Sequence, residues 1–171
     1  MSGRMMDCSG MMVVVKGGGE MATGVAHRLA RSGFRVCLTE IPEPQAVRRE
    51  AAFCEAVFDG QKEVDGLISR RVTGEREILE AWEEKMIPLV VDPECRIREI
   101  LQPPILVDAI LAKRNTGTRL EDASLVIGLG PGFRAGKDVH LVVETNRGHN
   151  LGRVIEDGEA EPDTGVPGEI G

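Results

Sequence analysis

Apolar residues along this chain gather in short runs, and between many of these runs apolar positions recur at helical spacing. The short runs predict strands at 12–15, 34–40, 63–64, 67–72, 88–91, 105–107, 125–127, 140–144 and 153–155. The helical spacing predicts helices at 22–31, 45–57 and 75–85, the last of them capped by Thr73. Over 11–108 the two kinds of segment alternate, which is typical of an α/β fold with a mainly parallel sheet and helices on both faces.

The first predicted strand runs directly into a glycine-rich turn that opens the next helix. Gly17, Gly19 and Ala22 fit the dinucleotide-binding fingerprint G-x-G-x-x-G/A. The first glycine permits the tight turn, the second lets a pyrophosphate approach the backbone, and the small third residue lets helix and strand pack closely. Since the helix start offers unpaired N–H groups to an anion, we expect nucleotide binding at Gly17, Gly18, Gly19, Ala22 and Thr23. The alternative is a turn that serves only strand–helix packing.

The second predicted strand ends in an acidic residue at the position where such a fold binds ribose. Glu40 lies 23 residues after Gly17, close to the roughly 20 residues expected for a ribose-binding carboxylate. The strand, the turn and this acid together predict a Rossmann-like fold. Arg48 and Arg49 follow and could hold a 2′-phosphate, or could be a solvated helix start. The choice between NAD and NADP therefore stays open, with Glu40 favouring NAD.

Two later segments place polar groups at the expected carboxyl ends of strands. Asp108 and Lys113 follow the strand at 105–107, where side chains point into a ligand crevice, although Asp108 could equally cap a helix. The strand at 125–127 runs into a second glycine turn, followed by Arg134 and Lys137, which could cradle an anion or be merely flexible. The expected binding residues of that turn are Gly128, Gly130 and Gly132.

The histidines offer a less specific pattern. His140 and Glu144 lie on one face of a predicted strand, but period-two spacing sets neighbours about 7 Å apart and does not gather ligands around a metal. We therefore expect no metal site. General acid–base chemistry at His140 or His149 stays open, whereas His27 lies inside the first predicted helix and is interpreted as structural.

Composition narrows the class of protein. The 171 residues suit one domain, and 42% apolar content is enough for a core. A net charge of −7 argues against binding nucleic acid or acidic membranes, and no apolar stretch reaches the roughly 18 residues that span a bilayer. The four cysteines are widely spaced and are expected to be free thiols in a reducing cytoplasm.

Several long segments carry a family resemblance. The chain resembles the selenium-dependent molybdenum hydroxylase system proteins, which are related to accessory proteins of the XdhC/CoxF type, in segments 16–29, 39–49, 107–118, 126–133, 144–155 and 163–171. The resemblance covers nearly all of 12–171 and implies a role in maturing a selenium-containing molybdenum hydroxylase. It carries over no catalytic residue, and Lys16 and Gly18 stand where an alanine-containing turn is common in the family. Family members also continue into a small β-rich module.

These observations predict a disordered leader at 1–11, a Rossmann-like nucleotide-binding domain at 12–157 and a linker at 158–171 toward a C-terminal module absent from this chain. The first functional hypothesis is a cytoplasmic maturation factor that binds NAD(P) or a molybdenum cofactor dinucleotide, since both contain a pyrophosphate. The alternatives are an NAD(P)-dependent oxidoreductase with Lys113 or His140 as proton donor, and a non-enzymatic binding protein. The loops with Asn146, Arg147 and His149 could meet the first glycine turn across one polar crevice that needs a cover. We therefore also predict a homo-oligomer or an open, partly disordered crevice.

Overall fold

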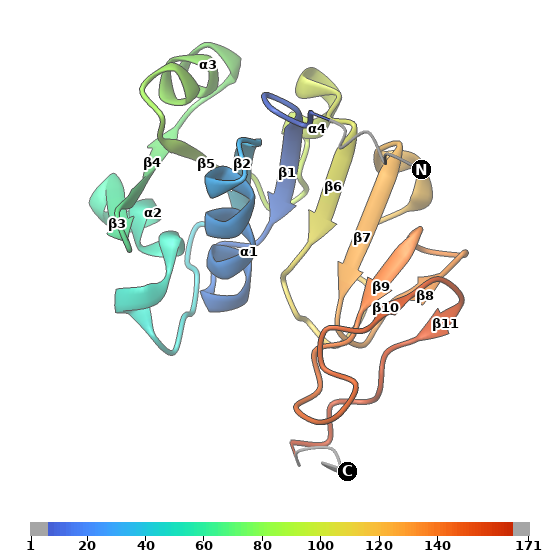
Figure 1. Cartoon of the computed structure of the whole chain (residues 1–171). Helices are drawn as coiled ribbons and strands as arrows, with labels where there is room; N and C mark the ends of the chain where they lie inside the picture. Colours follow the sequence, from blue (N-terminus) through green and yellow to red (C-terminus); the bar gives the residue numbers. More distant parts are fainter. Residues whose placement is uncertain (1–6, 166–171) are drawn as a thin grey trace.

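A computed structural model describes residues 7–165 of the chain, and its centre is a nine-stranded sheet (Figure 1). The strand order is β10-β9-β7-β6-β1-β2-β5-β4-β3. All pairs are parallel except β3 with β4 and β9 with β10, at the two edges. The bounds are β1 Met12–Lys16, β2 Arg35–Glu40, β3 Gln61–Val64, β4 Leu67–Val72, β5 Ile87–Val91, β6 Ile105–Asp108, β7 Leu125–Leu129, β9 Leu141–Val143 and β10 Val154–Ile155. This mostly parallel α/β sheet is the predicted Rossmann-like arrangement.

Helices pack on both faces of the sheet, as predicted. Alternation along β1 divides its side chains between two cores, with Val13 and Val15 in one and Val14 in the other. The first core includes Ala26 of α1, and the second includes Ile78 of α3. The helices are α1 Glu20–Arg31, α2 Ala56–Asp59, α3 Glu75–Glu83 and α4 Ile97–Leu101. The apolar runs of the central strands are thus explained by burial on both sides.

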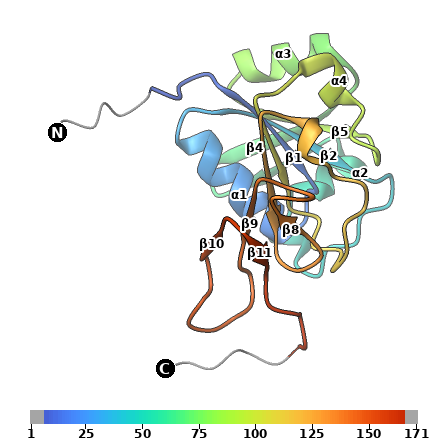
Figure 2. The same cartoon turned by 90° about the vertical axis from the view of Figure 1, so that its right-hand side faces the viewer.

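The chain reverses direction across the sheet at β1, which sets the place of a ligand site. From β1 the chain builds β2 on one side, and it later returns to add β6 on the other. In open parallel sheets ligands bind outside the carboxyl ends of the strands at such a switch point. In Figure 1 the arrowheads of β1, β6 and β7 point downward, and the segment after β9 lies at that lower end in both views (Figures 1 and 2).

The helix predicted at 45–57 is wrong. The segment forms two 3₁₀ turns, Arg49–Ala51 and Phe53–Glu55, before the short α2. The N–H of Phe53 donates to Thr23 Oγ1 at 2.9 Å, and the N–H of Cys54 donates to the Gly18 carbonyl at 2.8 Å. These two amides are bonded to the first glycine turn and its helix, so they are not available for a regular helix.

The start of α3 also differs from the prediction. Its N-cap is Gly74, while Thr73 donates through its N–H and hydroxyl to the carboxylate of Glu77. The helix ends at Glu83 because Lys85 adopts a left-handed backbone with φ of 59°. The sequence also gave no signal for α4 or for the small second sheet of β8 Arg134–Ala135 and β11 Gly158–Glu159.

Both ends of the described chain contact the fold. Residues 1–6 of the expected leader lie outside the described residues, and the turn that follows donates from Gly10 N to the Gly33 carbonyl at 2.9 Å. In the expected linker, β11 pairs with β8 and Ala160 is buried, while residues 166–171 lie outside the described part. The division into domains stays a prediction. No helix within 7–165 is long and apolar enough to cross a membrane.

Candidate functional site

The glycine turn after β1 requires glycine at its first position. Gly17 has a φ of 102°, which L side chains rarely adopt. Its N–H donates to the Thr39 carbonyl of β2 at 2.8 Å, and a Cβ there would lie 3.2 Å from the carbonyl oxygen of Ala109. Gly17 therefore lets β1, β2 and the loop after β6 approach one another closely.

The second and third glycines have different surroundings. Gly18 is buried, and a Cβ there would lie 3.2 Å from both Cys54 Cβ and Glu40 Oε2. A Cβ on Gly19 would have nothing within 4 Å, and Gly19 is the N-cap of α1. Ala22 and Thr23 are both buried, as close packing of this helix on β1 requires. Protein atoms thus surround the turn at Gly18, whereas the space beside Gly19 is open.

Glu40 lies beside this turn, where the sequence placed it. Its carboxylate accepts the N–H of Gly18 at 2.7 Å and the N–H of Ile41 at 2.8 Å. Burial raises the pKa of Glu40 above its usual value, although both N–H bonds act in the opposite direction. The carboxylate therefore fixes the turn to the end of β2 while one side of it lines a cavity.

That cavity has a volume of about 840 Å³ and lies at the carboxyl ends of β1, β2 and β6. Such a volume lies within the roughly 300–1,000 Å³ that ligand sites occupy. Its walls come from the glycine turn and the start of α1, from segment 40–48, and from loop 109–111. Arg48 is exposed on this wall, and its N–H donates to Glu20 Oε1 at 2.6 Å. We call this space the first cavity.

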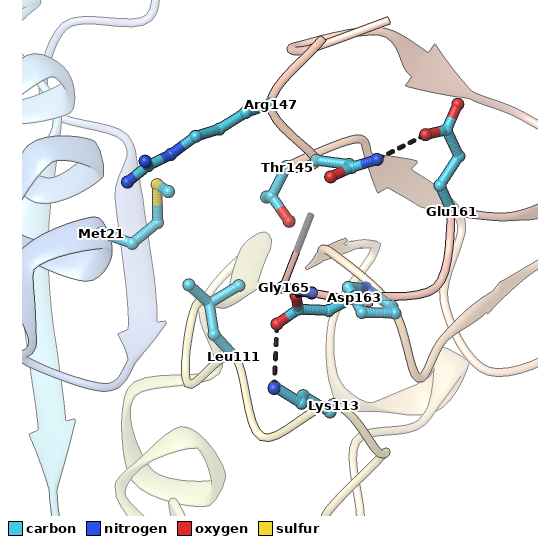
Figure 3. Close-up of a pocket in the computed structure, with 10 residues that line it drawn as sticks. Met21, Leu111, Lys113, Thr145, Arg147, Glu161, Asp163 and Gly165 are labelled. Carbon is cyan, nitrogen blue, oxygen red and sulfur yellow. Dashed lines mark hydrogen bonds and ion pairs between the residues drawn. The ribbon is translucent and has the colours of Figure 1, made fainter. Parts of the chain in front are cut away.

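Figure 3 shows the residues that line a second cavity, which has a volume of about 430 Å³. Its walls carry an ion pair between Lys113 Nζ and Asp163 Oδ2 at 3.0 Å, which lowers the pKa of Asp163. Asn146 Nδ2 donates to Glu161 Oε2 at 2.6 Å on the opposite wall. Three residues line both cavities, namely Met21, Leu111 and Arg147, and we call this junction the waist.

The second glycine turn does not open into either cavity through its glycines. A Cβ on Gly128 would lie 2.5 Å from the Phe133 ring, and one on Gly132 would lie 2.6 Å from Arg114 Cα. A Cβ on Gly130 would lie 2.6 Å from Thr145 Oγ1. Pro131 is the residue of this turn that lines the second cavity. These glycines thus permit close packing between the turn and the two loops that form the second cavity.

Asp108 is buried beneath the crevice rather than pointing into it. Its Oδ2 lies 3.3 Å from Lys16 Nζ and accepts the Thr118 hydroxyl at 2.6 Å. Lys16 Nζ also donates to Thr118 Oγ1 at 2.6 Å, and both charged side chains are at most 7% exposed. Lys16 and Asp108 are register partners in β1 and β6, so the ion pair joins the ends of the two strands at the switch point. Sequence reasoning missed the part played by Lys16.

Two of the histidines, His140 and His27, are held by backbone groups, whereas His149 is exposed. His140 Nδ1 accepts the N–H of Val126 at 2.9 Å, and His27 Nε2 lies 3.1 Å from the Asp65 carbonyl. Cys54 lines the first cavity, but burial and the nearby Glu40 raise its pKa to about 11, so it is a neutral thiol at pH 7. Across the described ranges, no group of three or more His, Cys, Asp and Glu side chains could hold a metal ion.

Comparisons with known proteins identify one relative. No family model matches the chain, and no solved structure matches it. The chain is 50% identical over 159 residues to a protein of Escherichia coli (strain K12) named YqeB and described as uncharacterized. The match covers 93% of this chain but 29% of YqeB, so the chain spans less than a third of that protein's length. The chain is therefore a homologue of one part of YqeB.

Proposed function

We propose that this chain binds a nucleotide or dinucleotide at the glycine turn after β1. The observation that carries the proposal is the open side of that turn at Gly19, where a Cβ would meet no atom within 4 Å. Among the described residues no side chain caps α1, whose N-cap is Gly19. A phosphate can therefore reach the first N–H groups of α1, at the positive end of the helix dipole.

Glu40 supports a ribose next to that phosphate. Each of its carboxylate oxygens accepts one backbone N–H, and an ionised carboxylate oxygen has a further lone pair for a ribose hydroxyl. A 2′-phosphate would be repelled by Glu40 and attracted by Arg48, which lines the same cavity. The proposed ligand class is NAD(P) or a dinucleotide form of the molybdenum cofactor, and Glu40 favours NAD over NADP.

The cellular role follows from the family resemblance and rests on it alone. Within this proposal the chain is an accessory factor in the maturation of a selenium-dependent molybdenum hydroxylase, which would be its partner. The test is hydroxylase activity in cells that carry the wild-type chain or a Gly19→Val variant. Light scattering of the purified chain tests the homo-oligomer expected from the sequence.

Calorimetric titration with NAD, NADP, AMP, CMP and molybdopterin cytosine dinucleotide tests the site itself. Gly19→Val places side-chain carbons where the phosphate would lie, so we expect at least a tenfold loss of affinity without loss of folding. The matched control is Gly24→Val, since Gly24 is exposed and lies outside both cavities. If Gly19→Val binds as tightly as the Gly24→Val control, the turn serves only packing.

A further inference from the structure

Arg147 is the cation of the crevice that lines both cavities and that has no charged partner among residues 7–165. It is exposed, and within 7–165 its side chain makes neither an ion pair nor a hydrogen bond. The nearest acidic residues of the second cavity are already engaged, Asp163 by Lys113 and Glu161 by two asparagines. In a chain of net charge −7, a guanidinium that has no partner within 7–165 and lies at the junction of two cavities indicates a site for an anion.

The loop that carries Arg147 is held firmly at its base. Glu144 is buried, and its carboxylate accepts the N–H of Asn146 at 2.8 Å and the N–H of Glu161 at 2.7 Å. Asn150 on the same loop donates to Glu161 Oε1 at 3.0 Å. The backbone before Arg147 is therefore fixed, so the direction in which the side chain leaves the loop is also fixed.

That direction leads across the crevice toward the first turn of α1. Figure 3 shows the Arg147 guanidinium reaching Met21, the second residue of α1. The uncapped start of the helix and the guanidinium thus face the same space at the waist from opposite sides. A guanidinium and a helix N-terminus that line the same cavity can both donate hydrogen bonds to one anion.

The loop after β6 shows the strain that functional sites often store. Leu111, at the waist, has a φ of 57°, and Lys113, two residues later, has a φ of 61°. For residues with a Cβ, such left-handed backbone costs roughly 1–2 kcal/mol per residue. The close approaches of Gly17 to Ala109 and of Gly132 to Arg114 hold both ends of this loop. The strained segment coincides with the wall shared by the two cavities.

The second cavity has the chemistry of a site for a polar group. Its walls combine a cation, two carboxylates, a hydroxyl and an amide, from Lys113, Asp163, Glu161, Thr145 and Asn146. Such a mixture of donors and acceptors suits a sugar or a polar heterocycle better than an apolar chain. The described residues that it shares with the first cavity are the three waist residues.

We infer that the ligand has two arms joined by a pyrophosphate, and that Arg147 holds this pyrophosphate at the waist. One nucleotide lies in the first cavity beside Glu40, and the other arm lies in the second cavity. The inference rests on the proposed nucleotide site, and it adds the residue that holds the pyrophosphate and the cavity that holds the second arm. Arg147 is thereby the residue that distinguishes a dinucleotide from a mononucleotide.

The test compares paired probes on the full chain, AMP with NAD and CMP with molybdopterin cytosine dinucleotide, by calorimetric titration. In the wild type we expect one of the dinucleotides to bind at least about tenfold more tightly than its mononucleotide. Arg147→Ala should weaken that dinucleotide about 10- to 100-fold, the range for lost charge-assisted hydrogen bonds, and change the mononucleotide less than about twofold. Arg147→Lys should recover only part of the loss, because lysine cannot bind two oxygens in parallel.

The matched control is Arg153→Ala, which removes an exposed arginine of the same loop that lines neither cavity. Equal wild-type affinities for the two members of a pair would overturn the inference and leave the nucleotide site standing. Equal losses for mononucleotide and dinucleotide in Arg147→Ala, or no loss, would also overturn it. Failure of the wild type to bind any of the four probes would overturn the proposed function together with the inference.

Discussion

The two glycine turns of this protein look alike in sequence and differ in what surrounds them. Each follows a buried parallel strand, β1 or β7, and each contains three glycines within five residues. In the first turn Gly19 faces the first cavity, whereas each glycine of the second turn approaches protein atoms too closely for a Cβ. Of these two turns, the first therefore has a glycine position that is open toward a cavity, and the second does not.

Loop 109–114 packs against both turns, since Gly17 approaches its first residue and Gly132 approaches its last. The buried ion pair of Lys16 and Asp108 lies at the start of this loop. Asp108 also accepts the N–H of Ile110 at 3.2 Å within that loop. The pair lies under both turns because β1, β6 and β7 are neighbours. The comparison between the turns thus predicts four effects of decreasing size, and the largest is expected at the buried ion pair beneath the turns.

The largest expected effect comes from Asp108→Ala. This change leaves the buried Lys16 ammonium without its counter-ion, and breaking a buried pair costs about 3–5 kcal/mol. The measurement is urea denaturation. The control is Glu84→Ala, which breaks the more exposed pair with Arg70 and should cost about 1 kcal/mol or less. Equal losses for the two variants would show that the pair is not what supports the switch point.

The next largest effect separates the two turns directly. Gly132→Ala places a Cβ within 2.8 Å of three backbone atoms of Arg114, at a φ of 107°. Overpacking and backbone strain together should cost about 2–4 kcal/mol of unfolding free energy. Gly19→Ala meets no atom and should cost less than about 1 kcal/mol. Similar denaturation midpoints for the two variants would contradict the view that the second turn is closely packed and the first turn is open at Gly19.

The sequence predicted the strands of the central sheet because continuous apolar runs are typical of parallel strands buried on both faces. Glu40 was found for a similar reason, since its distance from Gly17 along the chain is set by one strand–helix–strand unit. The helix predicted at 45–57 does not form, because the amides of Phe53 and Cys54 are hydrogen-bonded to the first glycine turn and to α1, 30 or more residues earlier in the chain. Local spacing contains no information about such long-range partners.

The same limit applies to the site. In the sequence, Lys16 is the polar residue at the end of an apolar strand. Its burial is explained by its register partner Asp108, which lies far along the chain. The sequence indicates only that the loop containing Arg147 is polar. The position of Arg147 at the waist depends on the hydrogen bond by which Glu144 holds this loop. From its composition the second glycine turn could cradle an anion or be merely flexible, and the sequence could not show that a Cβ on each of its glycines would meet protein atoms.

A smaller effect is expected for Glu40→Gln, which tests how the first turn is held. Glutamine has one acceptor oxygen for the two N–H groups of Gly18 and Ile41, so we expect a loss of roughly 1–3 kcal/mol. Because burial raises the pKa of Glu40, the folded state binds its proton more readily than the unfolded state. Wild-type stability relative to the variant should therefore fall as the pH rises from the usual value of 4.5 through the raised pKa, and then stay constant. A difference that grows with pH would contradict this sign.

The smallest effect is expected when a glycine is introduced instead of removed. The site is a non-glycine residue that has a left-handed backbone. Lys113→Gly relieves a φ of 61°, worth roughly 1–2 kcal/mol, and loses roughly 0.5–1 kcal/mol through the greater freedom of the unfolded chain. It also breaks the exposed pair with Asp163, worth about 0–1 kcal/mol, so the denaturation midpoint should stay close to that of the wild type. Asp163→Asn, which breaks the pair and keeps the strain, separates the two contributions and should be slightly the less stable of the two variants. If Lys113→Gly lowers the free energy of unfolding by more than about 2 kcal/mol, the lysine side chain itself holds the loop between the turns. The glycines of the second turn would then not be sufficient to hold it.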